Sequence, residues 1–149
     1  MSAAIKVGCD PELFSHDNSS YRPVHDWLKG SKKEPFKVKG GAFQVDGMAA
    51  EFNIDPASTA AEFDDNVRGV LNQLITEAQK AKRVLVATPT TEFTSGIWEK
   101  TPAEYKVLGC DPDYDYSGSP NPNPGEKLLN VPLRTAAGHI HIGWTEHEL

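Results

Sequence analysis

The sequence predicts an α+β protein with a curved, mostly antiparallel β-sheet and one long helix packed behind it. Two segments carry most of this prediction: residues 42–54, AFQVDGMAAEFNI, and residues 138–143, GHIHIG. In both, polar and apolar side chains alternate with the period of two that is typical of a β-strand. Residues 60–78 instead repeat apolar side chains with the period of a helix. We therefore expect a sheet with one polar, concave face and one apolar face that the helix covers.

Length and charge limit the classes of protein to which this chain can belong. The chain has 149 residues and a net charge of −6. This length suits one domain, residues 1–149, with a hydrophobic core. The charge argues against a nucleic-acid or membrane-surface binder, because both need a basic face. Neither a membrane span nor a signal peptide is recognisable, so we expect a cytoplasmic protein. Cys9 and Cys110 are too few for a disulfide framework and are interpreted as free, buried thiols.

The N-terminal third predicts a strand, a long polar loop and a short edge strand. The first strand covers residues 4–10 and ends at Pro11. Asp10 and Glu12 are two residues apart, so their side chains can project to the same side. Residues 15–34 are rich in turn residues, and within them Gly30-Ser31-Lys32-Lys33 fits either a phosphate-binding loop or an ordinary solvated loop. Residues 35–39 predict the edge strand.

The pair Asp46-Gly47 predicts a β-hairpin, because a two-residue primed turn of this type requires positive φ at both central residues. In the strand that follows, Glu51 and Asn53 share the polar face. The apolar face of the same strand comprises Met48, Ala50, Phe52 and Ile54. In GHIHIG, His139 and His141 likewise share one face.

A helix is predicted after Asp55-Pro56, which ends the strand. Thr59 and Glu62 form a capping box at its start. Its apolar stripe comprises Phe63, Val67, Val70, Leu71, Leu74, Ile75 and Ala78. The stripe identifies this helix as the element that packs on the apolar face of the sheet.

The C-terminal half predicts shorter elements. Residues 84–88 predict another strand, and a second capping box, Thr101 with Glu104, predicts a brief helix that begins at Pro102. Residues 111–126 form a long loop, of the kind that is usually functional or mobile.

Three acidic residues of that loop, Asp111, Asp113 and Asp115, invite a calcium-binding interpretation. The EF-hand pattern does not fit them. Tyr116 stands where glycine is required, and Pro122 stands where the closing glutamate should be.

The polar face carries metal-binding types of side chain on three separate segments: Glu12, Glu51 and His139. If the fold brings them together, carboxylates with one imidazole suit Mg²⁺ or Mn²⁺. Ions of this kind, shared with the phosphates of a nucleotide, are the usual arrangement in phosphoryl transfer. The histidine pair by itself fits a structural role as well as a ligand role.

Four segments also carry a family resemblance: GCDPELF (8–14), VDG with EFNIDPA (45–57), GCDPD (109–113) and RTAAGHIHIG (134–143). In sequence and in order they resemble the phage-type COOH-NH2 ligases, or amidoligases, of the glutamine synthetase and glutamate–cysteine ligase superfamily. The resemblance implies a glutamine synthetase-like domain, with helices on the convex side of the sheet and ATP and divalent ions on the concave face. It also implies a reaction in which ATP phosphorylates a carboxylate and an amine attacks the acyl phosphate to form an amide.

The resemblance assigns roles to individual residues. Glu12, Glu51 and His139 match metal ligands of the family, with Asp10 at a partner position. Asp46, Asn53, His141 and Arg134 match substrate or catalytic contacts, and Lys32 and Arg134 match contacts to the phosphates of ATP. The substrates implied are a carboxylate and an amine, each a small molecule or a peptide.

One departure from the family keeps several interpretations open. Family members continue beyond the histidine strand with a further segment that carries a metal-binding glutamate, so the resemblance implies that this chain corresponds to the N-terminal portion of the fold. A ligase, a non-catalytic phage binding, assembly or inhibitor protein on the same scaffold, and a metal-dependent hydrolase are all compatible with the residues. An exposed sheet edge would be covered by a second copy or by a complementing chain.

Overall fold

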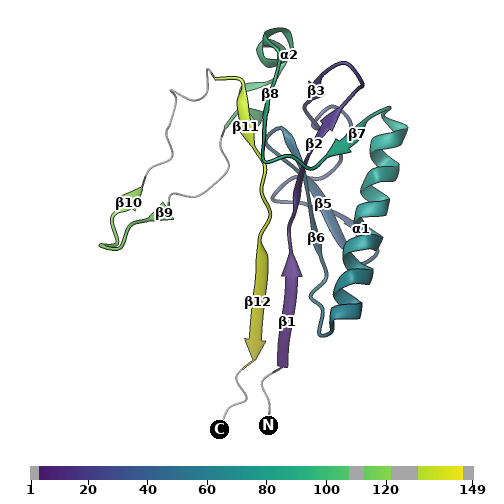
Figure 1. Ribbon diagram of the computed structural model, residues 1–149, viewed down its shortest axis with the longest axis vertical. Helices are drawn as coiled ribbons and strands as arrows, with labels where there is room; N and C mark the ends of the chain where they lie inside the picture. Colours follow the sequence, from purple (N-terminus) through teal and green to yellow (C-terminus); the bar gives the residue numbers. More distant parts are fainter. Residues whose placement is uncertain (1–3, 108–112, 122–130, 146–149) are drawn as a thin grey trace.

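The computed structural model describes residues 4–107, 113–121 and 131–145. Its elements in chain order are β1 (Ala4–Cys9), β2 (Glu12–His16), β3 (Tyr21–Arg22), β4 (Phe36–Val38), β5 (Gly41–Asp46), β6 (Ala49–Ile54), α1 (Ala60–Lys80), β7 (Val84–Val86), β8 (Thr90–Glu92), α2 (Ser95–Lys100), the 3₁₀ turn η1 (Ala103–Tyr105), β9 (Asp113–Tyr114), β10 (Pro120–Asn121), β11 (Leu133–Thr135) and β12 (Ile140–Thr145). Antiparallel strands curl strongly into a half-barrel, with α1 against one side (Figure 1). The predicted α+β class is confirmed.

The strands pair in a way that brings distant segments of the chain together. The main sheet has the order β3-β2-β6-β5-β4, and β7 also pairs with β2. Strands β1 and β12 form an antiparallel ribbon, in which Gly8 lies opposite His141. The ribbon continues into β2, because the amides of Asp10 and Glu12 donate to the carbonyls of His139 and Ala137. The N-terminal and C-terminal segments therefore lie side by side along the main sheet.

The predicted hairpin is present, but its turn lies one residue later than expected. Asp46 pairs with Ala49, so the central turn residues are Gly47 and Met48 and not Asp46 and Gly47. Gly47 has a φ of 54°, whereas Met48 is not among the residues with positive φ. A turn with positive φ only at its first central residue needs one glycine, as in type II′. This shift keeps Asp46 in the strand, where its carboxylate faces the polar side of the sheet.

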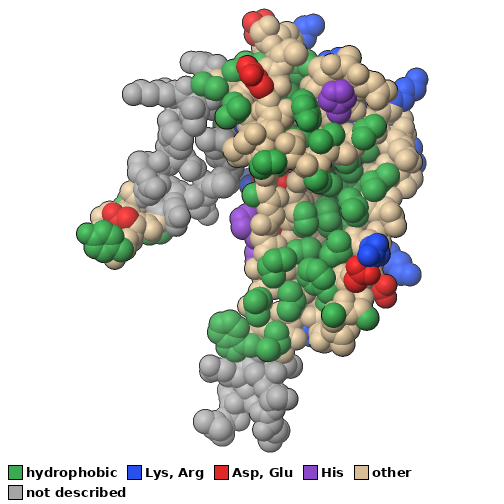
Figure 2. Space-filling view, viewed as in Figure 1, with side chains coloured by type: hydrophobic (Ala, Val, Ile, Leu, Met, Phe, Trp, Pro, Cys, Tyr) green, Lys and Arg blue, Asp and Glu red, His purple; other side chains and the backbone are tan. Residues whose placement is uncertain are grey.

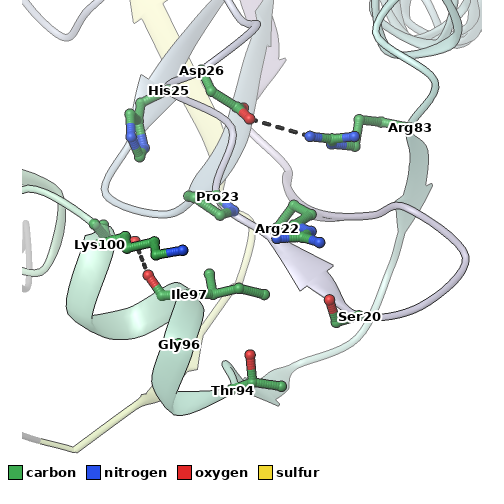
Figure 3. A pocket seen from close by; sticks show the side chains of 11 residues that line it. Ser20, Arg22, Pro23, His25, Asp26, Arg83, Thr94, Gly96, Ile97 and Lys100 are labelled. Atoms are coloured by element: carbon green, nitrogen blue, oxygen red, sulfur yellow. Dashed lines mark hydrogen bonds and ion pairs between the residues drawn. The ribbon is translucent and has the colours of Figure 1, made fainter.

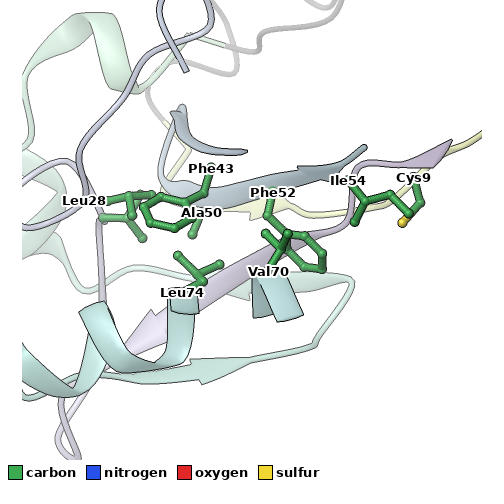
Figure 4. Packing of buried hydrophobic residues seen from close by; sticks show 9 residues of the cluster. Cys9, Leu28, Phe43, Ala50, Phe52, Ile54, Val70 and Leu74 are labelled. Carbon is green, nitrogen blue, oxygen red and sulfur yellow. The ribbon is translucent and has the colours of Figure 1, made fainter. Parts of the chain in front are cut away.

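The long helix follows the prediction closely. Thr59 is the N-cap and accepts a hydrogen bond from the amide of Glu62. The Glu62 carboxylate accepts one from the amide of Ser58 rather than from the cap residue itself. Figure 4 shows Val70 and Leu74 of α1 packed against side chains of β5 and β6. The buried members of this cluster are Cys9, Val24, Leu28, Phe43, Ala50, Phe52, Ile54, Val70 and Leu74.

A second, smaller core joins the hairpin turn to the C-terminal half. Met48 and Ala49 pack there with Phe14, Phe93 and Trp98. By contrast, the outer part of the β1–β12 ribbon has no core behind its apolar face in the described part of the chain. Figure 2 shows hydrophobic side chains below the centre of the molecule, where Figure 1 places this ribbon. The large apolar residues of the two strands that are exposed are Ile5, Ile140, Ile142 and Trp144.

The second capping box was a wrong prediction. Thr101 does not cap a following helix; its hydroxyl donates to the carbonyl of Ile97 and closes α2, which was not predicted. The segment that begins after Pro102 is a single 3₁₀ turn without a side-chain cap. A threonine hydroxyl can bond a carbonyl four residues earlier as readily as a cap amide, and here the first choice prevails.

The remaining predictions on the chain have mixed outcomes. The strands expected over 35–39 and 84–88 appear as β4 and β7. The turn-rich stretch after residue 15 contains the short strand β3 and the fully buried Val24, neither of which was predicted. Cys9 is buried and free, as expected. Cys110, Asp111, Pro122 and the segment 109–112 of the resemblance lie outside the described residues.

Candidate functional site

Strand register places a row of polar side chains across three strands. Glu12 of β2 pairs with Glu51 of β6, and Glu51 in turn pairs with Gln44 of β5. Directly paired residues of antiparallel strands project to the same face. The two glutamates, which are far apart in the sequence, therefore stand next to one another on the polar face of the sheet.

Asp46 joins the two glutamates in a compact carboxylate triad. One oxygen of each of Glu12, Asp46 and Glu51 lies within 4.8 Å of the others. All three side chains are half-buried. The family resemblance implied a substrate or catalytic contact for Asp46, and its place in the triad follows from the turn that keeps it in β5.

The two glutamates of the triad have raised pKa values. Burial raises the pKa of Glu12 and of Glu51 above the ordinary value, and the nearby carboxylate of Asp46 raises both further. Two hydrogen bonds oppose this effect: the amide of Ala137 donates to Glu12 at 2.8 Å, and the Gln44 side chain donates to Glu51 at 2.9 Å. Crowded, half-buried carboxylates of this kind are stabilised by a cation.

Lys32 supplies part of that positive charge. Its ammonium nitrogen lies 2.9 Å from an Asp46 carboxylate oxygen, and the lysine side chain is about half exposed, at 48%. The loop that carries Lys32 therefore reaches the polar face of the sheet. This position does not decide between a phosphate-binding loop and an ordinary solvated loop.

Asp10 and the two histidines form a second cluster beside the triad. The His141 Nε2 atom lies 2.9 Å from one Asp10 oxygen, and the His139 Nδ1 atom lies 3.1 Å from the other. The His139 amide also donates to Asp10. Burial alone would raise the pKa of Asp10, but these hydrogen bonds outweigh it and hold the pKa below its ordinary value.

Two cavities flank the triad and contain the other predicted site residues. A cavity of about 350 Å³ is lined by Asp10, Glu51, Asn53 and His141, among others. A smaller one of about 140 Å³ is lined by Glu12, Asp46, His139 and Arg134. The site residues predicted from sequence thus lie in one region of the molecule.

Arg134 differs from the other predicted residues because its guanidinium is already engaged. It is buried, donates to the backbone carbonyls of Val131, Leu133 and Lys106, and lies 4.4 Å above the Trp98 ring. Through these contacts Arg134 links β11 to the segment after η1, which is a structural role.

The arrangement of metal-type side chains also differs in detail from the expected set. Within the residues that the structure describes, the only triad close enough for one ion is Glu12, Asp46 and Glu51, so His139 and Asp10 stand beside it rather than in it. Gln44 was not predicted at all. Its position two residues before Asp46 on the same strand is the signal that would have placed it on the polar face.

The carboxylate triad fits a hard divalent cation. Its donors are oxygens, which Mg²⁺ and Mn²⁺ prefer, and Lys32 pairs with one of its half-buried carboxylates, that of Asp46. No helix in the described residues is long and apolar enough to cross a membrane. Comparisons with protein-family models, with curated proteins and with solved structures found no match.

Proposed function

We propose that this protein is an ATP- and Mg²⁺-dependent carboxylate–amine ligase with a glutamine synthetase-like fold. The observation that carries the proposal is the carboxylate triad of Glu12, Asp46 and Glu51 on the polar face, flanked by two cavities. The family resemblance of the same segments supplies the reaction class. Mn²⁺ can replace Mg²⁺ at a site of this kind.

In this proposal the chain's own residues bind and orient the reactants. Glu12, Glu51 and Asp46 hold the divalent ion, whose positive charge stabilises the negative charge of the phosphates. Asp10 fixes the two imidazoles through its two oxygens, which keeps His141 at the larger of the two flanking cavities and His139 at the smaller one. Asn53 and His141 line the cavity in which we place a substrate.

The proposed reaction has two steps. A carboxylate oxygen of the first substrate attacks the γ-phosphorus of ATP, and ADP leaves. The nitrogen of the amine then attacks the acyl carbon, inorganic phosphate leaves, and the nitrogen loses a proton to become an amide. The substrates are a carboxylate and an amine, each a small molecule or a peptide, in the cytoplasm of a bacterial host if a phage encodes the chain.

The first experiment is a calorimetric titration of the chain with ATP, with Mg²⁺ in excess and with EDTA. We expect saturable binding that requires Mg²⁺, and its loss in Glu51→Gln. A matched control is Glu99→Gln, which removes an exposed carboxylate of α2 and should bind as the wild type does. Hydroxylamine can then serve as the amine, because it converts an acyl phosphate into a hydroxamate that is measured by colour.

The outcomes separate the three interpretations of the site. Binding of Mg²⁺ without any effect of ATP would favour a metal-dependent hydrolase. Absence of both would favour a non-catalytic binding, assembly or inhibitor protein. Equal loss of binding in Glu51→Gln and Glu99→Gln would contradict the assignment of the triad.

A further inference from the structure

A third cavity is lined by more cationic than acidic side chains. Its volume is about 430 Å³, and it shares no lining residue with the two cavities that flank the triad. Figure 3 shows it between the segment around Pro23, the start of β7 and the short helix α2. A volume of this size suits a small molecule or one group of a larger ligand.

Three cationic side chains from three separate segments line this cavity: Arg22 of β3, Arg83 just before β7, and Lys100 at the end of α2. In Figure 3 they surround Pro23 from different sides. Three cationic side chains thus line one cavity of a chain whose net charge is −6.

Neighbouring carboxylates engage only part of this positive charge. Arg22 Nε bonds Asp17 at 2.5 Å, and one terminal nitrogen of Arg83 lies 3.2 Å from Asp26. These bonds anchor the two guanidinium groups, because each aspartate holds one edge of the planar fork. Both arginines keep further N–H groups that these carboxylates do not use.

Two side-chain nitrogen atoms of residues that line the cavity have no hydrogen-bond partner among the described residues. The Nε atom of Arg83 is buried and makes no hydrogen bond. Buried polar groups are nearly always paired, so an acceptor from outside the chain is the expected partner of this donor. His25, whose ring stacks on Tyr105 at 4.2 Å, also has a buried Nδ1 atom without a partner.

We propose that this cavity binds a small oxyanion that carries at least two negative charges, either a phosphoryl group or a polycarboxylate. Arg83 and Arg22 hold it through their planar forks, and Lys100 adds a point charge from the opposite wall. Both kinds of anion share the chemistry that the three cations recognise, namely several oxygens with delocalised negative charge. The proposal does not depend on the ligase function, since neither Mg²⁺ nor the carboxylate triad takes part.

The test is a titration in EDTA, without nucleotide, with inorganic phosphate and separately with citrate, followed by NMR of the backbone amides and of the arginine Nε–H groups. We expect saturable shifts of Arg83 Nε–H and of amides around Pro23, and the anion that saturates at lower concentration identifies the source. Lys100→Gln should weaken the affinity about tenfold, as loss of one charged hydrogen bond does. Arg83→Lys keeps the charge but removes the fork and should weaken it further.

Two controls make the result decisive. Lys37→Gln removes an exposed lysine of β4 that does not line the cavity and should leave the affinity unchanged. Glu51→Gln should also leave it unchanged, so that failure of the ligase proposal does not affect this one. Shifts that never saturate, or that weaken equally in Lys100→Gln and Lys37→Gln, would show only general screening of charge and would overturn the proposal.

Discussion

Glu51 is the residue at which the needs of folding and of binding oppose each other. Its carboxylate is half-buried and lies close to those of Glu12 and Asp46. Burial first, and then the charges of Asp46 and Asp10, raise its pKa above the ordinary value of 4.5. A raised pKa in the folded state means that ionisation of Glu51 costs stability, and this cost is largest at neutral pH.

We therefore predict that Glu51→Gln stabilises the metal-free protein at neutral pH. The glutamine can still accept the hydrogen bond from Gln44, while the charge repulsion disappears. The stability that a protonated Glu51 confers is present below its unfolded-state pKa and is lost as the pH rises through the higher folded-state pKa. The advantage of Glu51→Gln should accordingly grow as the pH rises from about 4 towards 7.

Urea titrations of both proteins in EDTA over this pH range measure the difference in unfolding free energy. Glu99→Gln, at an exposed position, should show no such trend. A Glu51→Gln variant that is less stable at neutral pH would mean that the carboxylate has a structural role. A more stable variant would also exclude unfolding as the reason for any loss of ATP binding.

The sequence predicted the faces of the site residues but not their contacts. Alternation is a local property, so it placed Glu51 with Asn53 and His139 with His141 correctly on shared faces. The pairing of Glu12 with Glu51 depends on the register between β2 and β6, which no local pattern encodes. The same limit explains why the contact of both histidines with Asp10 could not be seen in advance.

At the scale of elements, α1 was predictable because its signals are local. The cap and the apolar stripe lie within the helix itself, and Val70, Leu74 and Ala78 are buried as the stripe requires. Strands β8 and β11 each have three residues, too few for alternation to be recognised. They exist because each pairs with the other across the second core, a long-range interaction.

Gly69 has a low helix propensity, and no neighbouring atom requires glycine at this position of α1. It is exposed, its φ is not positive, and a Cβ atom built there would meet nothing within 4 Å. We predict that Gly69→Ala stabilises the protein by about 0.5–1 kcal/mol, because alanine loses less conformational freedom in a helix. Thermal and urea unfolding measure the change. Asn72→Ala, at an exposed position one turn later in α1, is the matched control and should increase the stability by less. A Gly69→Ala variant that is less stable than the wild type would contradict the prediction.

At the scale of the whole molecule, curling of the sheet accounts for both the site and an unprotected edge. The half-barrel brings residues 137–139 against residues 10–12, which completes the polar face. The ribbon of β1 and β12 then extends away from the core, as Figure 1 shows. The sequence analysis expected a polar face and an exposed edge. It could not say which strands pair to form them, because the pairing depends on where the sheet bends.

Strand β12 has the properties of an edge that a second copy can cover. In the described residues it pairs only with β1, so its other edge is open. Its sequence, IHIGWT, contains none of the lysines, glutamates or prolines with which edge strands commonly prevent association. Ile140, Ile142 and Trp144 are 62%, 61% and 65% exposed, so their apolar surface is available for contact.

We predict a symmetric dimer in which β12 pairs antiparallel with β12 of a second copy, because a two-fold axis lets one strand complement itself. Sedimentation velocity over a range of concentrations should show the dimer, and Ile142→Lys should convert it to monomer by placing a charge in the contact. Val84→Lys is the matched control, since Val84 is similarly exposed, at 57%, but lies on β7. A wild-type protein that stays monomeric, or a dimer that Val84→Lys disrupts as strongly as Ile142→Lys, would contradict pairing through β12.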